Sequence, residues 1–513
     1  MKFRNIDEQN QAEKTYFKSM QKRLLYVFFI VIALLVILIA VIIKIALTSE
    51  NDYNITILKQ QNYTTNIIPY RRGTITDRNG TVLATSERVY ILILDPSVIL
   101  ANNAKNEEAT LNALHEKYGF DYYEMKECIE ANPKRAYIRY KKNISEADKT
   151  AFENYVEEYN KSDTAKEKGK ITGVWYENDY KRVYPFSTLA CTVLGFSGTD
   201  SARGNWGLEE YYNSELIGNN GREYGYVNED GVAERNVVAA DDGNTLVSTI
   251  DYTIQDATEK KIAEFLESYD ADNVAAIVMN PNNGEILAMA TDKSYDLNDP
   301  SNLEYLYSPE EIAVMTDEQL SAARGRMWKN FCVQDAYEPG STAKPFTVSA
   351  ALEEKIVSES SEFYCEGEKH FGIEAYETIV HCNSTHGHID LSESLMFSCN
   401  SAMMDIAAAM GPEIFSKYQT VFGFGRQTGI DLPGETAGIL YDADTMQEVD
   451  LATNAFGQNY NVNMVQLAAA FASCINGGNY YQPHMVKQIL NSSGEVVKTI
   501  DPILVRKTIS TET

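Results

Sequence analysis

The longest apolar run of the chain lies near its N-terminus, at residues 24–43. These 20 residues carry no charge, and as an α-helix they extend about 30 Å, the thickness of a bilayer core. Lysine and arginine precede the run, which predicts a cytoplasmic tail at 1–23 and an uncleaved single-pass transmembrane anchor at 24–47. The run is too long for a signal peptide. The protein is therefore predicted to lie in the cell membrane, with residues 24–43 in the lipid bilayer and most of the chain outside the cytoplasm.

The pattern changes twice between residues 48 and 242. Short apolar runs alternate with turns at 68–96, where Asn79-Gly80 is typical of a β-hairpin. Residues 102–168 are charged and poor in glycine, which indicates an inserted helical lobe. Strand-and-turn sequence returns at 171–238. We therefore expect a β-rich domain at 48–242 with a helical insertion at about 102–168.

A second domain is predicted at 243–513. Strand and helix patterns alternate in it, which predicts an antiparallel sheet with flanking helices and hence a multidomain α+β protein. The expected elements are a strand at 245–250, a helix at 253–269, a hairpin of 275–279 with 285–289, helices at 391–410, 412–422 and 462–476, and a late hairpin of 485–490 with 496–500.

The charge of the chain excludes one class of partner. Its net charge is −28 and its pI is about 4.7, whereas a protein that binds nucleic acid needs basic surface to meet the phosphates. The seven cysteines are too few for a disulfide framework in a chain of 513 residues.

Ser341 and Lys344 form the first candidate catalytic pair. Pro339 and Gly340 end the preceding segment, and the apolar run 346–352 predicts a buried helix beginning near Ser341. Residues three apart share a helix face, so the lysine amine can accept the serine proton if burial keeps it neutral. This pattern predicts a serine nucleophile for acyl transfer. The same spacing at Ser19 and Lys22 falls in the predicted cytoplasmic tail.

Ser398 and Asn400 form the second candidate group. They flank Cys399 between an apolar segment and a helical run, where both side chains can face one cleft. A serine there can relay a proton and an asparagine can bind a substrate amide. Capping of the helix is the alternative role for such residues.

Several segments together resemble penicillin-binding proteins of the monofunctional class B. The segment 338–345, Glu-Pro-Gly-Ser-Thr-Ala-Lys-Pro, and Ser398-Cys399-Asn400 are similar to the first two active-site motifs of that family. The other matching segments are 72–80, 182–185, 204–209, His386-Gly387 and 456–458.

The resemblance implies an elongated pedestal domain at 48–242 and a transpeptidase domain of the serine β-lactamase type at 243–513. It implies a D,D-transpeptidase that cross-links peptidoglycan stem peptides ending in D-Ala-D-Ala and is acylated by β-lactam antibiotics. Ser341 would be the nucleophile, Lys344 the base in acylation, and Ser398 and Asn400 the proton relay and amide-binding group. A membrane glycan polymerase is the implied partner, and no cofactor is needed.

The third active-site motif of that family, Lys-Thr-Gly, does not occur in the sequence. Lys498-Thr499 and Lys507-Thr508 are each followed by isoleucine, which would obstruct substrate at an edge strand where glycine permits close approach. We therefore expect a C-terminally incomplete transpeptidase domain with poor activity.

Histidine and cysteine cluster between residues 365 and 388. The spacing fits no common structural zinc pattern, so no metal is expected, and Cys365 with Cys382 is a candidate disulfide. Cys399 is expected to be a buried thiol. The residues of the cluster are Cys365, His370, His381, Cys382, His386 and His388.

Two other functions stay open on the sequence alone. One is a non-catalytic scaffold of the division or elongation machinery, which needs the pedestal but no active site. The other is a penicillin-sensing receptor or β-lactamase, which needs no long pedestal and would differ in its deacylation rate.

Overall fold

The computed structural model describes residues 32–41, 64–101, 104–198, 203–227, 233–373 and 376–513. The chain divides into two compact units, one of Met1–Ile68 with Gly221–Ala239 and one of Pro69–Asn220 with Ala240–Thr513.

The membrane span predicted at 24–43 falls mostly outside the described residues. Residues 32–41 are helical and exposed. In the described part of the chain, no helix has both the length and the apolar character needed to cross a membrane. The predicted tail at 1–23, with Ser19 and Lys22, also lies outside the described residues.

The first unit contains a three-stranded antiparallel sheet. Its strand order is β1 (Thr64–Ile68), β8 (Gly221–Val227) and β9 (Ala233–Val238). Ile68 lies opposite Gly221, and Arg222 lies opposite Val238.

The second unit contains a seven-stranded sheet with strands from both halves of the chain. The predicted hairpin at Asn79-Gly80 is confirmed, because β2 and β3 pair antiparallel across it. β2 also pairs in parallel with β10, which lies beyond residue 242 in sequence. The order is β19 (Val496–Thr499), β18 (Val486–Leu490), β10 (Thr245–Ser248), β2 (Ile75–Thr76), β3 (Val82–Leu94) and β4 (Ile138–Ile144), with β5 (Val174–Val183) also on β3.

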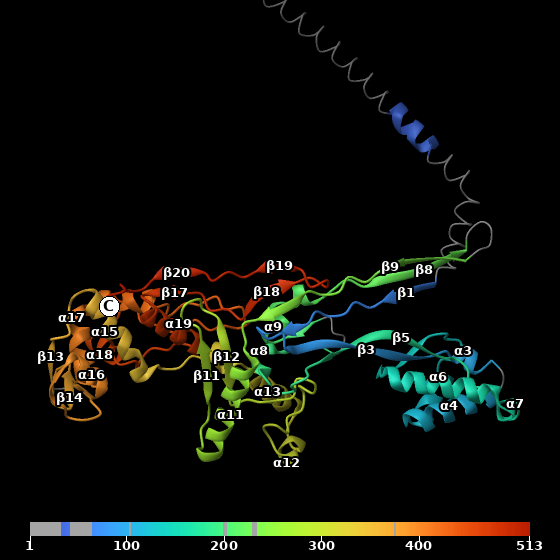
Figure 1. Ribbon diagram of the computed structural model, residues 1–513, viewed down its shortest axis with the longest axis horizontal. Coiled ribbons are helices and arrows are strands. Elements are labelled where there is room, and N and C mark those ends of the chain that lie inside the picture. Colours follow the sequence, from blue (N-terminus) through green and yellow to red (C-terminus); the bar gives the residue numbers. More distant parts are fainter. Residues whose placement is uncertain (1–31, 42–63, 102–103, 199–202, 228–232, 374–375) are drawn as a thin grey trace, which may run out of the picture. The chain divides into compact units, whose positions relative to one another are not determined.

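The predicted insertion is helical, but it also contains strand β4. Its helices lie beside β3 and β5 in Figure 1 and share a core that includes Leu92, Leu111 and Phe152. Ile138 and Tyr140 pack against this core while Arg139 and Lys141 alternate with them, and this period of two favours a strand. The helices of the insertion are α4 (Ala104–Tyr118), α5 (Tyr122–Glu130), α6 (Glu146–Lys161) and α7 (Asp163–Lys168), and α3 (Pro96–Ile99) precedes it.

A buried ion network joins three of the segments that carry the family resemblance. Glu209 Oε2 accepts from Arg72 Nε at 2.7 Å, and Glu209 Oε1 accepts from Arg182 Nε at 2.7 Å. Tyr184 also donates to Glu209, and the side chains of Arg72 and Glu209 are fully buried. Burial alone would raise the pKa of Glu209, but the charges of Arg182 and Arg72 outweigh it and lower that pKa. The carboxylate of Glu209 therefore links the three segments to one another through ion pairs and hydrogen bonds. The short elements around it are α8 (Cys191–Leu194), β6 (Phe196–Ser197), β7 (Gly204–Asn205), α9 (Gly207–Tyr211) and α10 (Asn213–Leu216).

The C-terminal half forms helices around short two-stranded ladders. The predicted hairpins are confirmed as β11 with β12 and β18 with β19. The single antiparallel sheet expected here is not formed, because β18 and β19 join the seven-stranded sheet and the other strands pair separately. The elements are α11 (Tyr252–Ser268), β11 (Ala275–Met279), β12 (Ile286–Thr291), α12 (Pro309–Ala313), α13 (Asp317–Trp328), α14 (Phe331–Gln334), α15 (Lys344–Glu353), α18 (Glu448–Asn454), α19 (Met464–Ile475), β17 (Asn479–Tyr481) and β20 (Leu504–Lys507).

The helix expected at 391–410 is two helices. α16 (Leu391–Met396) and α17 (Asn400–Val421) are separated at Ser398, whose φ of 52° lies in the left-handed region. α17 continues through a kink at Gly411, after which the helix expected at 412–422 follows. Helices α15 to α18 gather around β13 (Glu362–Cys365) and β14 (Glu368–Phe371), which pair with β16 (Gly387–Asp390) and β15 (Thr378–His381) (Figure 1).

Candidate active site

Ser341 lies on the short 3₁₀ helix Gly340–Ala343 that leads into α15. Gly340 has a φ of 57°, a conformation that glycine adopts without a steric penalty. The side chain of Ser341 is exposed, while Lys344, on the same face three residues later, is only 2% exposed. The local geometry therefore places an accessible hydroxyl next to a buried amine.

Ser341, Lys344 and Ser398 form a closed triangle of hydrogen-bonding atoms. Lys344 Nζ lies 3.1 Å from Ser341 Oγ and 2.7 Å from Ser398 Oγ, and Ser398 Oγ lies 2.9 Å from Ser341 Oγ. Lys344 Nζ also donates to the carbonyl oxygen of Ser398 at 2.6 Å. A neutral amine has two N–H donors and one lone pair, so it can bond twice to Ser398 and accept the hydroxyl proton of Ser341.

Burial lowers the pKa of Lys344 below the ordinary lysine value. The charged ammonium loses hydration at this site, so the neutral form is present at lower pH than in a free lysine. A lysine so placed can act as a general base toward an adjacent serine.

Among the described residues, no hydrogen bond joins the Asn400 side chain to this triangle. Its amide Nδ2 donates to the carbonyl oxygen of His381 at 3.1 Å, which turns the side chain toward β15. The structure thus brings three of the four predicted site residues together, while the fourth, at the start of α17, bonds to the end of β15.

A loop at residues 456–459 supports the turn that carries Ser341. The N–H of Gly340 donates to the carbonyl of Gly457 at 2.8 Å, and the N–H of Asn459 donates to Glu338 Oε1 at 2.8 Å. A Cβ on Gly457 would lie 1.9 Å from the carbonyl oxygen of Gly340. The sequence does not show this supporting role of residues 456–458, because their contact with Gly340 forms only in the folded chain.

Replacing Gly457 by alanine should displace the Ser341 turn. We expect acylation of Ser341 by a fluorescent penicillin to slow by about 10²-fold, the usual effect of an ångström-scale misplacement of reacting atoms. Gly325→Ala is the matched control, because nothing lies within 4 Å of a Cβ there. Equal labelling rates of the two variants would contradict the supporting role of Gly457.

Neither Lys-Thr pair near the C-terminus lies in the Ser341 triangle. Thr508 is buried and donates to Ser473 Oγ at 3.1 Å, while Lys498 and Thr499 line a separate cavity beside Tyr212. No hydrogen bond joins either pair to Ser341 within the described part of the chain.

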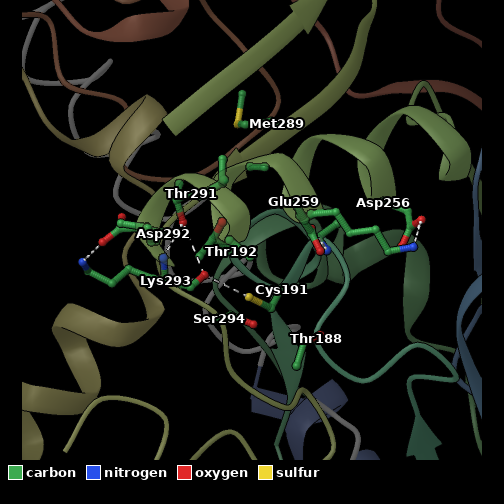
Figure 2. Close-up of a pocket in the computed structure, with 16 residues that line it drawn as sticks. Thr188, Cys191, Thr192, Asp256, Glu259, Met289, Thr291, Asp292, Lys293 and Ser294 are labelled. Atoms are coloured by element: carbon green, nitrogen blue, oxygen red, sulfur yellow. Dashed lines mark hydrogen bonds and ion pairs between the residues drawn. The ribbon is translucent and has the colours of Figure 1, made fainter. Parts of the chain in front are cut away.

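A second cavity, of about 330 Å³, lies between α8, α11 and β12 and lacks a reactive group. Figure 2 shows Lys293 paired with Asp292. Lys260 pairs with Asp256 in the same lining. Glu259 accepts from the backbone N–H of Ala190, and burial raises the pKa of the Cys191 thiol to about 12. The cavity therefore offers no activated nucleophile.

The triangle places an accessible serine hydroxyl beside a buried amine, and comparison with known proteins identifies the family. Residues 274–513 match the penicillin binding protein transpeptidase domain, and residues 67–248 match the penicillin-binding protein dimerisation domain. The chain belongs to the penicillin-binding proteins, and the dimerisation domain followed by the transpeptidase domain places it in class B.

The similar proteins include a sporulation protein and a peptidoglycan D,D-transpeptidase. The chain is 32% identical over 452 residues to Stage V sporulation protein D of Bacillus subtilis. The aligned region covers 86% of this chain and 63% of that protein. It is 26% identical over 424 residues to the peptidoglycan D,D-transpeptidase FtsI of Escherichia coli K12, covering 82% and 64%. Penicillin Binding Protein 2X from Streptococcus thermophilus superposes with a TM-score of 0.67 at 25% identity, covering 88% and 64%. The chain thus spans less than two thirds of the length of these relatives.

Proposed function

We propose that the protein is a serine D,D-transpeptidase that cross-links peptidoglycan stem peptides through an acyl-enzyme. The observation that carries the proposal is the triangle of Ser341 Oγ, Lys344 Nζ and Ser398 Oγ, with separations of 3.1, 2.7 and 2.9 Å. The names of relatives support it, since the similar protein of Escherichia coli is a peptidoglycan D,D-transpeptidase.

Acylation begins when neutral Lys344 accepts the proton of Ser341. The Ser341 oxygen attacks the carbonyl carbon of the penultimate D-Ala, and the bond to the terminal D-Ala nitrogen breaks. Ser398 passes a proton from Lys344 to that leaving amine, so free D-Ala departs and an ester remains on Ser341. An amine of a second stem peptide then attacks the ester, forms the cross-link and returns the proton to Ser341.

The remaining roles follow from this reaction. Asn400 would turn its side-chain oxygen to a substrate amide, because only its nitrogen is used by His381. β-Lactams would acylate Ser341 in place of the stem peptide; a similarly folded protein of Mycobacterium tuberculosis, penicillin binding protein 3, is described in complex with ampicillin. Residues 24–47 would anchor the chain in the cell membrane, and the domain at 48–242 would contact a membrane glycan polymerase, with 243–513 as the catalytic domain.

A transfer assay tests the reaction. The chain is incubated with a D-Ala-D-Ala stem-peptide analogue and a labelled D-amino acid, and exchange of the terminal D-Ala is followed by mass spectrometry. Because the sequence lacks Lys-Thr-Gly, the readout is the dependence of exchange on Ser341 and not its absolute rate. We expect Ser341→Ala to abolish exchange.

The control variant is Ser493→Ala, at an exposed turn between β18 and β19. It should exchange D-Ala as the unaltered chain does. Exchange that persists in Ser341→Ala, or is absent from the unaltered chain, would contradict the proposal.

A further inference from the structure

Three cysteines and a histidine converge behind the Ser398 turn. The ligand atoms of Cys365, Cys382, His386 and Cys399 all lie within 4.8 Å of one another. Cys382 Sγ lies 3.8 Å from Cys399 Sγ and 3.7 Å from His386 Nδ1. The other histidines of the sequence cluster have different neighbours: His370 and His381 lie beside Glu368, and the ring of His388 contacts that of Tyr364.

The separations of 3.7 and 3.8 Å match the edges of a tetrahedral metal site. Ligand atoms about 2.0–2.3 Å from a zinc ion at the corners of a tetrahedron are roughly 3.3–3.8 Å apart. Three thiolates and one imidazole are a ligand set that selects zinc over magnesium, calcium or manganese.

Backbone N–H groups point at two of the sulfur atoms of the cluster. The N–H of Asn400 donates to Cys382 Sγ at 3.2 Å, and the N–H of Ala402 donates to Cys399 Sγ at 3.4 Å. Backbone N–H groups that point at sulfur stabilise the negative charge that a metal-bound thiolate carries. The ring of His386 stacks on Phe397 with an interplanar angle of 8°, which fixes the direction of its nitrogen atoms.

The segment that supplies three of the four residues has very little apolar core. We call residues 361–390, with strands β13 to β16, the hairpin lobe. Among its described residues only Cys365 and Ile389 are buried. Two-stranded ladders with so few buried side chains are only marginally stable by themselves. A bound metal is a common way to stabilise such a small unit.

We propose that Cys365, Cys382, His386 and Cys399 bind one zinc ion that fastens the hairpin lobe to the start of α17. Cys399 stands between Ser398 and Asn400, so the ion also holds the left-handed turn at Ser398, whose φ is 52°. The candidate disulfide between Cys365 and Cys382 is not formed, since both are free thiols. A disulfide would use two of the four ligands, whereas zinc uses all of them.

Metal content tests the proposal without reference to activity. The full chain is purified without chelators under reducing conditions and analysed by inductively coupled plasma mass spectrometry. We expect one zinc per chain, reduced to background in Cys382→Ser. Cys128→Ser is the control and should retain the zinc, because this free thiol lies in the helical insertion, distant in sequence from the four proposed ligands. Zinc-free protein, or zinc that Cys382→Ser retains, would overturn the site.

A spectrum of the unaltered chain covers the case in which Cys382→Ser fails to fold. Zinc is exchanged for Co²⁺, and the visible absorption is recorded. Tetrahedral cobalt with thiolate ligands gives intense d–d and sulfur-to-metal bands, which we expect here and which His386→Ala should shift. Absence of these bands, or a Cys382–Cys399 disulfide found by peptide mapping of the reduced-purified protein, would overturn the proposal.

Discussion

Replacement of Lys344 by methionine is expected to slow acylation of Ser341 by a β-lactam by about 10²–10⁴-fold, the usual contribution of a general base. Methionine fills similar space in this buried position but cannot accept the proton of Ser341. Arginine should not restore the rate, because its guanidinium stays charged. The rate is measured by mixing a fluorescent penicillin with the full chain, quenching samples at intervals and quantifying the labelled protein.

The pH profile distinguishes a base from a packing residue. Because burial lowers the pKa of Lys344, acylation of the unaltered chain should rise with pH and level off at a lower pH than a free lysine would allow. The residual rate of Lys344→Met should lose this rise. Lys355→Met, at an exposed position after α15, serves as control and should keep both the rate and the profile. A Lys344→Met variant that retains them would remove Lys344 from the mechanism.

Replacement of Glu209 by glutamine is expected to lower the free energy of unfolding by about 3–5 kcal/mol, because it leaves buried arginine charges uncompensated. Arg72 and Arg182 both bond to this carboxylate, and their side chains are 0% and 3% exposed. The measurement is the urea midpoint of the full chain, followed by tryptophan fluorescence. Glu157→Gln is the control: it removes an exposed ion pair with Lys161, which solvent screens, and should leave the urea midpoint nearly unchanged.

The pH dependence of this stability has a definite sign. The pKa of Glu209 is lower in the folded chain than in the unfolded chain. The network therefore contributes fully above the ordinary carboxyl pKa, and its contribution is lost as pH falls through the folded value. Glu209→Gln should flatten the acid side of the stability curve. Equal urea midpoints of Glu209→Gln and Glu157→Gln would contradict the claim that this network stabilises the fold.

Local patterns in the sequence predict local structure well in this chain. The i, i+3 spacing of Ser341 and Lys344 and the turn at Asn79-Gly80 depend on neighbouring residues, and both are found in the structure. The break between α16 and α17 is different. Apolar residues continue through 391–410, but the left-handed backbone of Ser398 and the extended backbone of Cys399 interrupt the helix. The hydrophobic pattern does not encode these conformations.

Contacts between distant segments could not be read from the pattern. Ser398 lies 57 residues from Ser341 and reaches it only because α17 packs against α15. The convergence of Arg72, Arg182 and Glu209 depends in the same way on the tertiary fold.

The convergence of the cysteine cluster also could not be predicted from the sequence pattern. The sequence predicts no metal, because the spacing of Cys365, Cys382 and His386 fits no common structural zinc pattern. Cys399 stands in a different segment of the sequence. The fold supplies that fourth ligand atom.

The central claim is that Ser341 is the acylated nucleophile, and mapping of a β-lactam adduct tests it most directly. The full chain is incubated with a penicillin, digested, and sequenced by tandem mass spectrometry. We predict the added mass on Ser341 and its loss in Ser341→Ala. An adduct on any other residue of the chain, or one that survives in Ser341→Ala, would contradict the account.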